Sequence, residues 1–313
     1  MKIRLLGLAA LAVVSSAFGW DKAGHSLTAA IAYHDLEVRH PEIIPKMAAI
    51  LKQASDYGQQ LNWSAAIQHS SLPASAKRES LMLFILAARW PDDIKGDGTH
   101  RDKSPHDTHP WHYINMPYSI DGSPTFPAKE PNILTATAKL TTDWRTATDA
   151  EEKANILCFL THFVGDSHQP LHSTEAFSRQ FPKGDAGGGV WAIHSAAGAS
   201  KLHGFWDDVV IKGDDAAAGA ARIDEAAQRI AREHPRASLP QLTQNLEMKF
   251  WIERETFPLA KRYAYLDGKL PLPKKGEPTT LTESYKEDAR RVAETQMALA
   301  GYRMADLLYK LLK

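Results

Sequence analysis

Two histidines and an aspartate in one short segment have the types and spacing of metal ligands. His162 and Asp166 are four residues apart in a predicted helix, so both side chains leave the same face about one turn apart. This spacing suits two ligands of one zinc ion, or a carboxylate shared between two metals. Pro170 ends the helix, which lets His172 turn back toward the same place. Hydrogen-bonded histidines on an interior polar helix are the alternative.

A second pair repeats this geometry at His203 and Asp207, again four residues apart. An isolated histidine–aspartate pair at this spacing is common and can simply form a hydrogen bond on a helix surface. It supports metal binding because it occurs in the same chain as the first pair. Asp208 is a poorer match to the same helix face. His168 is six residues after His162 and faces another way, so we expect it outside the ligand set.

Further candidates lie earlier in the chain. Asp92 and Asp93 close a predicted helix, where carboxylates oppose the helix dipole; a bound cation or simple solvation would each account for them. His112 and Tyr113 follow a polar loop. His112 could be a metal ligand and Tyr113 could stack on a nucleobase, whereas a capped histidine and a core tyrosine are the alternatives.

The first nineteen residues have the pattern of a signal peptide. Lys2 and Arg4 precede an apolar run over residues 5–14, which is too short to span a membrane. Small residues then precede Trp20, so we expect cleavage there and a secreted or periplasmic protein. The new α-amine and carbonyl of Trp20 could chelate a metal, with His25 completing the site. Most mature N-termini are frayed ends, so this local signal is weak.

Helices must position these residues, because apolar residues recur at three- and four-residue steps along most of the chain. Strand-like alternation is nearly absent, and the candidate ligands are spread from residue 20 to residue 207. We therefore predict an all-α fold in a single compact domain, residues 20–313. The predicted helices cover about 22–38, 41–54, 77–90, 129–147, 150–168, 203–211, 219–233, 240–265 and 285–311.

Composition narrows the possibilities. The chain has 37 basic and 37 acidic residues, which argues against a broad basic surface that grips polyanions. A phosphate-bearing substrate would need local neutralisation, for which metal ions are suited. The one cysteine, Cys158, excludes an intramolecular disulfide and lies in an apolar run typical of the core.

Taken together, the motifs resemble those of the S1/P1 nuclease family. The motifs occur in the family's order and include a mature tryptophan start, a central segment from His162 to His172, and a pair at His203 and Asp207. A late segment, residues 301–305, resembles the family's final helix, so the resemblance extends over essentially the whole mature chain.

The resemblance implies a mainly helical fold with three zinc ions. One zinc would be held by Asp92, His112, His162 and Asp166. A second would be held by Trp20, His25 and the shared Asp166, and a third by His172, His203 and Asp207. Two close metals would lower the pKa of a shared water, and the third would stabilise the leaving 3′ oxygen. Lys95 matches a basic position that steadies the scissile phosphate; a solvated loop lysine is the alternative.

The sequence departs from the fungal members at the base-binding positions. Tyr113 stands where they have phenylalanine, which preserves stacking. Asn115 stands where they have an aspartate, and asparagine both donates and accepts hydrogen bonds, so base preference can differ. The loop at residues 187–189 lacks the asparagine that often follows two glycines there.

We therefore expect a zinc-dependent phosphodiesterase that cuts single-stranded DNA and RNA to 5′-phosphorylated products and acts as a 3′-nucleotidase on nucleotides. Zinc phospholipase C is the alternative, and an interfacial enzyme of that kind should expose apolar loops around its site. A zinc-binding protein without turnover is a third possibility. The polar loops favour nucleic acid, and we expect a monomer without stable membrane association.

Overall fold

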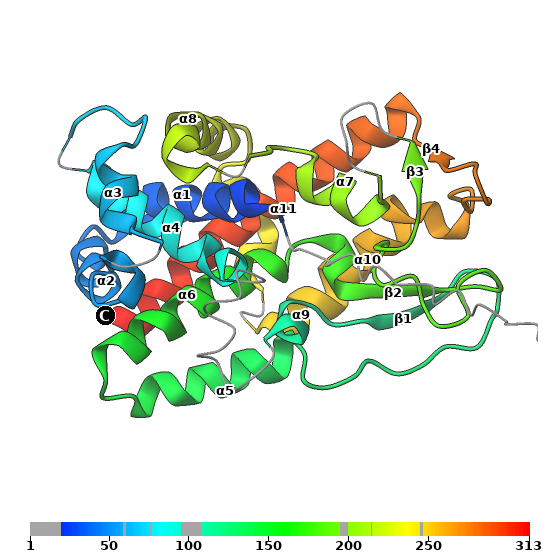
Figure 1. Ribbon diagram of the computed structural model, residues 1–313, viewed down its shortest axis with the longest axis horizontal. Helices are drawn as coiled ribbons and strands as arrows, with labels where there is room; N and C mark the ends of the chain where they lie inside the picture. The colour runs from blue at the N-terminus through cyan, green and yellow to red at the C-terminus, as the bar shows by residue number, and fades with distance from the viewer. Residues whose placement is uncertain are drawn as a thin grey trace, which may run out of the picture.

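The computed structural model describes residues 20–58, 61–75, 77–94, 108–194, 200–213, 215–244 and 247–313. The predicted signal peptide and Lys95 lie outside these residues. The described part is built almost wholly from helices, which confirms the all-α prediction (Figure 1). None of its helices combines the length and the apolar character needed to cross a membrane.

Four helices form the centre of the molecule, namely α1 (Lys22–Arg39), α4 (Arg78–Asp93), α6 (Ala150–Asp166) and α11 (Glu283–Leu312). Helix α1 contacts α4, α6 and α11 and is buried nearly all round over its first three turns, as expected of a helix surrounded by others. Gly301 permits the close approach of α11, since a Cβ there would lie 2.5 Å from Ile31 Cγ2.

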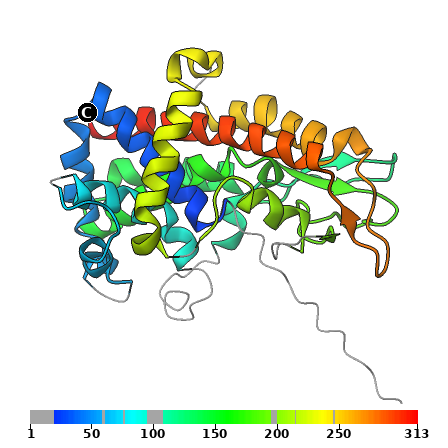
Figure 2. The ribbon, with the colours of Figure 1, turned by 90° about the horizontal axis from the view of Figure 1, so that it is seen from above.

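Further helices surround this centre. Their bounds are Ile43–Leu51 for α2, Trp63–Gln68 for α3, Ile133–Thr146 for α5, Leu202–Asp208 for α7 and Ala216–Glu233 for α8. In Figures 1 and 2, α8 crosses α1 and α11 on one side, and α5 lies beside α6. The central helices that carry candidate ligands are therefore covered by others on more than one side.

Prolines explain two of the differences between the observed and the predicted helices. Helix α5 begins at Ile133 rather than near residue 129, because Pro131 precedes Asn132, whose side chain caps the helix together with Thr135. The helix predicted over 240–265 is continuous only over 248–264. There α9 (Met248–Trp251) and α10 (Phe257–Leu259) alternate with wider π-helical turns at Ile252–Thr256 and Ala260–Ala264. Pro258 lacks an amide hydrogen for an α-helical bond, which accounts for the wide turn before it.

Two pairs of very short parallel strands complete the fold. Strand β1 (Met116–Ser119) pairs with β2 (Thr174–Phe177), and β3 (Ile193–His194) pairs with β4 (Thr279–Thr280). Strands of two to four residues carry too little alternation to be recognised in the sequence. Strand β1 follows the segment of His112 and β2 follows that of His172, so their pairing brings these two segments together.

Candidate metal centre

Helix α6 carries the first predicted pair of ligands at its C-terminal end. His162 and Asp166 are both fully buried, and His162 Nε2 lies 3.1 Å from Asp166 Oδ2. The predicted shared face is therefore real. Burial alone would raise the pKa of Asp166, but the neighbouring His162 and His172 hold it well below its usual range. A carboxylate that stays ionised in the interior is suited to binding cations.

Buried histidines and aspartates from α1, α4, α6, α7 and two 3-10 turns converge on this place. Three buried groups have the composition of metal sites, and within each group the ligand atoms lie within 4.8 Å of one another. Two of them share His162, and the third lies beside them, since His172 Nδ1 is 3.3 Å from Asp166 Oδ1. The groups are His25, His162 and Asp166; Asp92, His112 and His162; and His172, His203 and Asp207.

The spacing of the ligand atoms fits zinc. Ligands at about 2.0–2.1 Å from a tetrahedral zinc lie about 3.3 Å from one another. His25 Nε2 lies 3.4 Å from Asp166 Oδ1. His162 Nε2 lies 3.6 Å from Asp92 Oδ1, and His203 Nε2 lies 3.7 Å from Asp207 Oδ2. These distances are long for hydrogen bonds and close to those of two ligands on one ion.

Three of the histidines are oriented by backbone carbonyls. His162 Nδ1–H donates to the Ala88 carbonyl at 2.7 Å, and His172 Nδ1–H donates to that of His112 at 2.7 Å. His203 Nδ1–H donates to the Gly187 carbonyl at 2.6 Å. In the neutral imidazole each bond leaves Nε2 unprotonated with its lone pair facing the cluster, which is the usual arrangement of metal-bound histidine.

The third group shows most directly that the residues fit a cation. The Nε2 atoms of His172 and His203 lie 3.2 Å apart, and with both Nδ1 atoms protonated their lone pairs face each other. Burial raises the pKa of Asp207 well above its usual range, against a hydrogen bond at 2.6 Å from Gln169. A cation between these groups would relieve the lone-pair repulsion and keep the carboxylate ionised. Gln169 was not singled out from the sequence, although it directly precedes Pro170.

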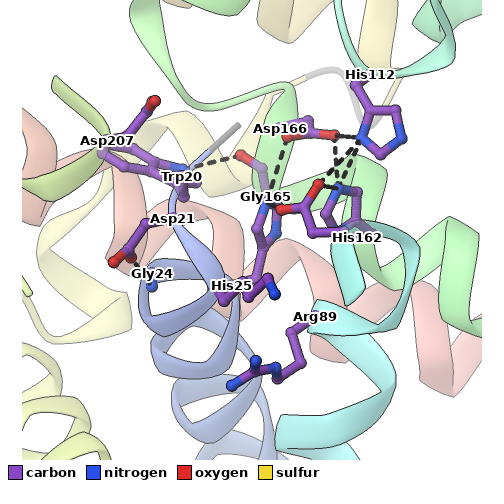
Figure 3. Close-up of polar contacts among 12 residues, drawn as sticks. Trp20, Asp21, Gly24, His25, Arg89, His112, His162, Gly165, Asp166 and Asp207 are labelled. Atoms are coloured by element: carbon purple, nitrogen blue, oxygen red, sulfur yellow. Dashed lines mark hydrogen bonds and ion pairs between the residues drawn. The ribbon is translucent and has the colours of Figure 1, made fainter. Parts of the chain in front are cut away.

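The start of α1 is fixed against the same centre. Trp20 is fully buried, and its indole N–H donates to the Gly165 carbonyl at 3.0 Å, beside Asp166 (Figure 3). Asp21 caps α1 through the amide of Gly24, and its second oxygen accepts from the Gly213 amide. Burial lowers the pKa of the His25 imidazole, and His162 lowers it further, which favours the neutral form that a metal ligand requires.

The structure separates the two aspartates that end α4. Asp92 is buried within the cluster, whereas Asp93 forms a two-point ion pair with Arg89 and lies 3.1 Å from Lys22. The neighbouring Lys95, predicted to contact phosphate, lies outside the described residues. Only Asp92 is thus available to a metal; the helix pattern left the choice open, and the family resemblance assigned it to Asp92.

His168 lies outside the ligand groups, as predicted from its helix face. Its Nδ1–H donates to the Val164 carbonyl, and its Nε2 lies 2.8 Å from Arg303, which also pairs with Glu255 at 2.7 Å. Burial and the Arg303 charge lower the pKa of His168 well below its usual value. It therefore serves as a neutral acceptor that joins α6 to α11.

A glycine-rich loop supports His203 and was not assigned this role from the sequence. Gly187 and Gly188 have φ angles of 57° and 81°, and a Cβ at Gly187 would lie 2.5 Å from the Leu171 carbonyl oxygen. Asp185 holds the loop by accepting from the amides of Gly188 and Ala176 and from a tyrosine hydroxyl. The run of glycines was the only signal in the sequence.

Tyr113 and Asn115 line a cavity next to the cluster. The Tyr113 ring lies edge-on to His172, with 6.4 Å between centroids. The cavity has a volume of about 730 Å³, within the range of small-molecule sites. Beyond these two residues it is lined by Pro110, Phe126, Pro127, Ala128, Lys129, Glu130, Pro131, Asn132, Glu175, Phe177 and Lys183.

The fold and this site define a helical protein with a candidate polynuclear metal centre next to an open cavity. Comparison with known families gives the identification: the S1/P1 nuclease family model matches residues 20–313, and the chain belongs to that family. The match begins at Trp20, the first residue of the predicted mature chain.

Curated relatives include endonucleases of Arabidopsis thaliana. Endonuclease 2 is 26% identical over 206 residues, which cover 62% of this chain and 57% of that protein. Endonuclease 5 is 25% identical over 258 residues, covering 71% of this chain and 75% of that protein. Endonuclease 1 is 27% identical over 221 residues, covering 67% and 59%. The chain thus spans little more than half the length of the first of these relatives.

Proposed function

We propose that this protein is a zinc-dependent phosphodiesterase that hydrolyses single-stranded DNA and RNA to 5′-phosphorylated products and also acts as a 3′-nucleotidase. The observation that carries the proposal is the set of three neighbouring ligand groups, two of which share His162 while the third approaches Asp166 through His172. The family match and the name endonuclease of the curated relatives support the same conclusion.

In this proposal the groups hold three zinc ions. Asp92, His112, His162 and Asp166 hold one, and Trp20, His25 and Asp166 hold a second. His172, His203 and Asp207 hold the third. Zinc in such a centre supplies a nucleophile from water at neutral pH and neutralises developing charge on phosphate oxygens.

The protein's own residues prepare the centre and bind the substrate. The carbonyls of Ala88, His112 and Gly187 fix the imidazoles, so the ligands need little rearrangement when metal binds. Tyr113 stacks on a base and Asn115 contacts its edge, while Lys95 steadies the scissile phosphate. The cavity beside Tyr113 gives the base a place next to the cluster.

Export belongs to the proposal. Cleavage before Trp20 gives a secreted or periplasmic monomer whose α-amine is a zinc ligand. The buried indole and the Asp21 cap support this role, because they hold the start of the chain beside Asp166. One extra residue before Trp20 turns the amine into an amide, so the extended protein should bind less zinc and lose activity. Full activity of the extended protein would refute this ligand.

The central experiment assays the mature protein on single-stranded DNA, RNA, a 3′-mononucleotide and phosphatidylcholine, with and without a chelator. Chelator-sensitive cleavage of the first three is expected. Hydrolysis of phosphatidylcholine alone would replace the proposal by a phospholipase. Among the exposed large apolar side chains of the described residues, only Phe126 lines the cavity, and exposed Lys129 and Lys183 lie there too. A single exposed aromatic side chain among charged residues is a poor match to a lipid surface.

A matched pair of variants connects activity to the metal. Asp207→Asn should remove the third zinc and most of the activity. Asp208→Asn makes the same chemical change one residue later, at a partly exposed carboxylate paired with Lys212. It should leave both the zinc content and the turnover unchanged.

A further inference from the structure

The cavity next to the metal cluster contains a carboxylate that the proposed function does not use. Glu175 lies on β2 opposite Pro117 of β1 and lines the same cavity as Tyr113 and Asn115. Its side chain is partly buried rather than free in solvent. A carboxylate at this place meets whatever group enters the cavity beside Tyr113.

Glu175 is held in place by the chain around it. The nearby Ala186 amide favours the ionised form of its carboxylate. Gly184, with φ 91°, lets the backbone pass so close that a Cβ there would lie 2.3 Å from Glu175 Oε1. Each carboxylate oxygen has two lone pairs, so acceptor capacity remains for a ligand. A fixed acceptor discriminates between ligands better than a mobile one.

The surroundings of Glu175 suit a nucleotide. Lys129 and Lys183 line the cavity, and within the described residues neither forms an ion pair, so their charge is available to phosphate. Phe126 also lines it, 55% exposed, with its ring against Phe177 at 5.8 Å between centroids. An exposed aromatic ring next to lysines is the usual combination for binding single-stranded nucleic acid.

Asn115 and Glu175 differ in the hydrogen bonds that they can form with a base. Asn115 both donates and accepts, so it fits the edge of any base, whereas an ionised Glu175 only accepts. Guanine presents two adjacent N–H groups on its Watson–Crick edge. Adenine and cytosine present one amino group beside a ring nitrogen acceptor, and uracil presents one N–H between two carbonyls. A carboxylate matches only guanine with both oxygens.

We propose that Glu175 determines base specificity in this cavity by accepting the two N–H groups of guanine. The proposal rests on the proposed function, since it names the base that the nuclease site prefers. Burial raises the pKa of Glu175, while the Ala186 amide and Lys129 oppose the shift. Lys129 thus offsets part of the raised pKa and does not reverse it.

The test measures kcat/KM of the zinc-loaded mature protein on the four 3′-mononucleotides. We expect guanosine to exceed uridine by roughly ten-fold, the worth of a bidentate pair. Glu175→Gln replaces one acceptor oxygen by an NH2 group, so the side chain offers a ligand one acceptor and one donor. Its preference should move from guanosine to adenosine, a change that a merely structural residue would not produce. Glu130→Gln makes the same substitution at an exposed residue of the same cavity and should leave the ratios unchanged.

Unchanged base ratios in Glu175→Gln would overturn the assignment even if the enzyme is fully active. Binding of 5′-GMP, 5′-AMP and 5′-UMP to the same proteins, measured by calorimetry, separates this outcome from a failure of the proposed function. If no nucleic acid is cleaved, the nuclease proposal fails, and the order of the three affinities still decides whether Glu175 selects guanine. Equal affinities in the unsubstituted protein would refute it.

Discussion

Gly165 gives a sharp test of how closely the first helix must approach the metal centre. It lies in α6 next to Asp166, where a Cβ would be 2.7 Å from His25 Nδ1 and 3.1 Å from His25 Cε1. An ordinary contact begins near 3.4 Å, so Gly165→Ala must displace the His25 ring by about 0.7 Å. His25 is fully buried in the core, which leaves little room for this shift.

The stability change should be small while the metal change is large. Overpacking costs about 1–3 kcal/mol, and alanine in place of glycine returns up to about 1 kcal/mol of helix propensity. The net loss in the free energy of unfolding is therefore about 0–2 kcal/mol. Displacement of His25 should weaken zinc binding by roughly 10–100-fold, which is the loss of metal affinity typical of mutating a residue that orients a metal ligand.

Two other glycines provide matched controls. Gly301→Ala brings a Cβ to 2.5 Å from Ile31 Cγ2 and should destabilise the fold without changing zinc affinity. Gly204 lies within α7 next to His203, and a Cβ there would meet no atom within 4 Å, so Gly204→Ala should be neutral or stabilising. Chemical denaturation and a competitive chelator titration measure the two quantities. Unchanged zinc affinity in Gly165→Ala would refute the role of His25.

Three further outcomes are expected. Asp166→Ala should remove two zinc ions, because the proposed ligand sets of both share this carboxylate; elemental analysis that still finds three would contradict sharing. Arg303→Met should lower the free energy of unfolding by about 3–5 kcal/mol, because buried His168 and partly buried Glu255 lose their partner, and zinc content should not change. Burial lowers the pKa of His34, but Asp224 and Glu37 outweigh it and raise the pKa above its usual value. This His34 contribution to stability is full below the unfolded-state pKa and is lost as pH rises through the folded-state pKa. Denaturation of the protein and of His34→Gln should therefore differ more at pH 6 than at pH 9, and an equal difference would count against the ion pairs.

Local spacing carried most of what could be predicted. The pair at His162 and Asp166 depends only on the pitch of one helix, and the structure places both side chains on the buried face of α6. The core helices were predicted for the same reason, since their apolar residues repeat at helical steps. The π-helical turns before and after Phe257–Leu259 were missed, because apolar periodicity does not distinguish them from an α-helix.

The supporting contacts could not be predicted, because they join residues far apart in the chain through backbone atoms. His203 is oriented by the carbonyl of Gly187 and His172 by that of His112. Every residue has a backbone carbonyl, so the sequence does not indicate which carbonyls accept a hydrogen bond from a histidine ligand. The choice of Asp92 over Asp93 likewise depends on where Arg89 and Lys22 lie.

At Trp20, part of the site could be predicted from the sequence and part only from the structure. In the sequence, Trp20 is an ordinary candidate terminus, and its proposed role came from the family resemblance. In the structure, the indole bond to Gly165 and the Asp21 cap fix the beginning of α1 through side chains alone. These contacts do not depend on whether the Trp20 nitrogen is an amine or an amide. Signal cleavage would therefore change the chemistry of a nitrogen that folding has already positioned, which is why export and assembly of the zinc cluster can be a single event.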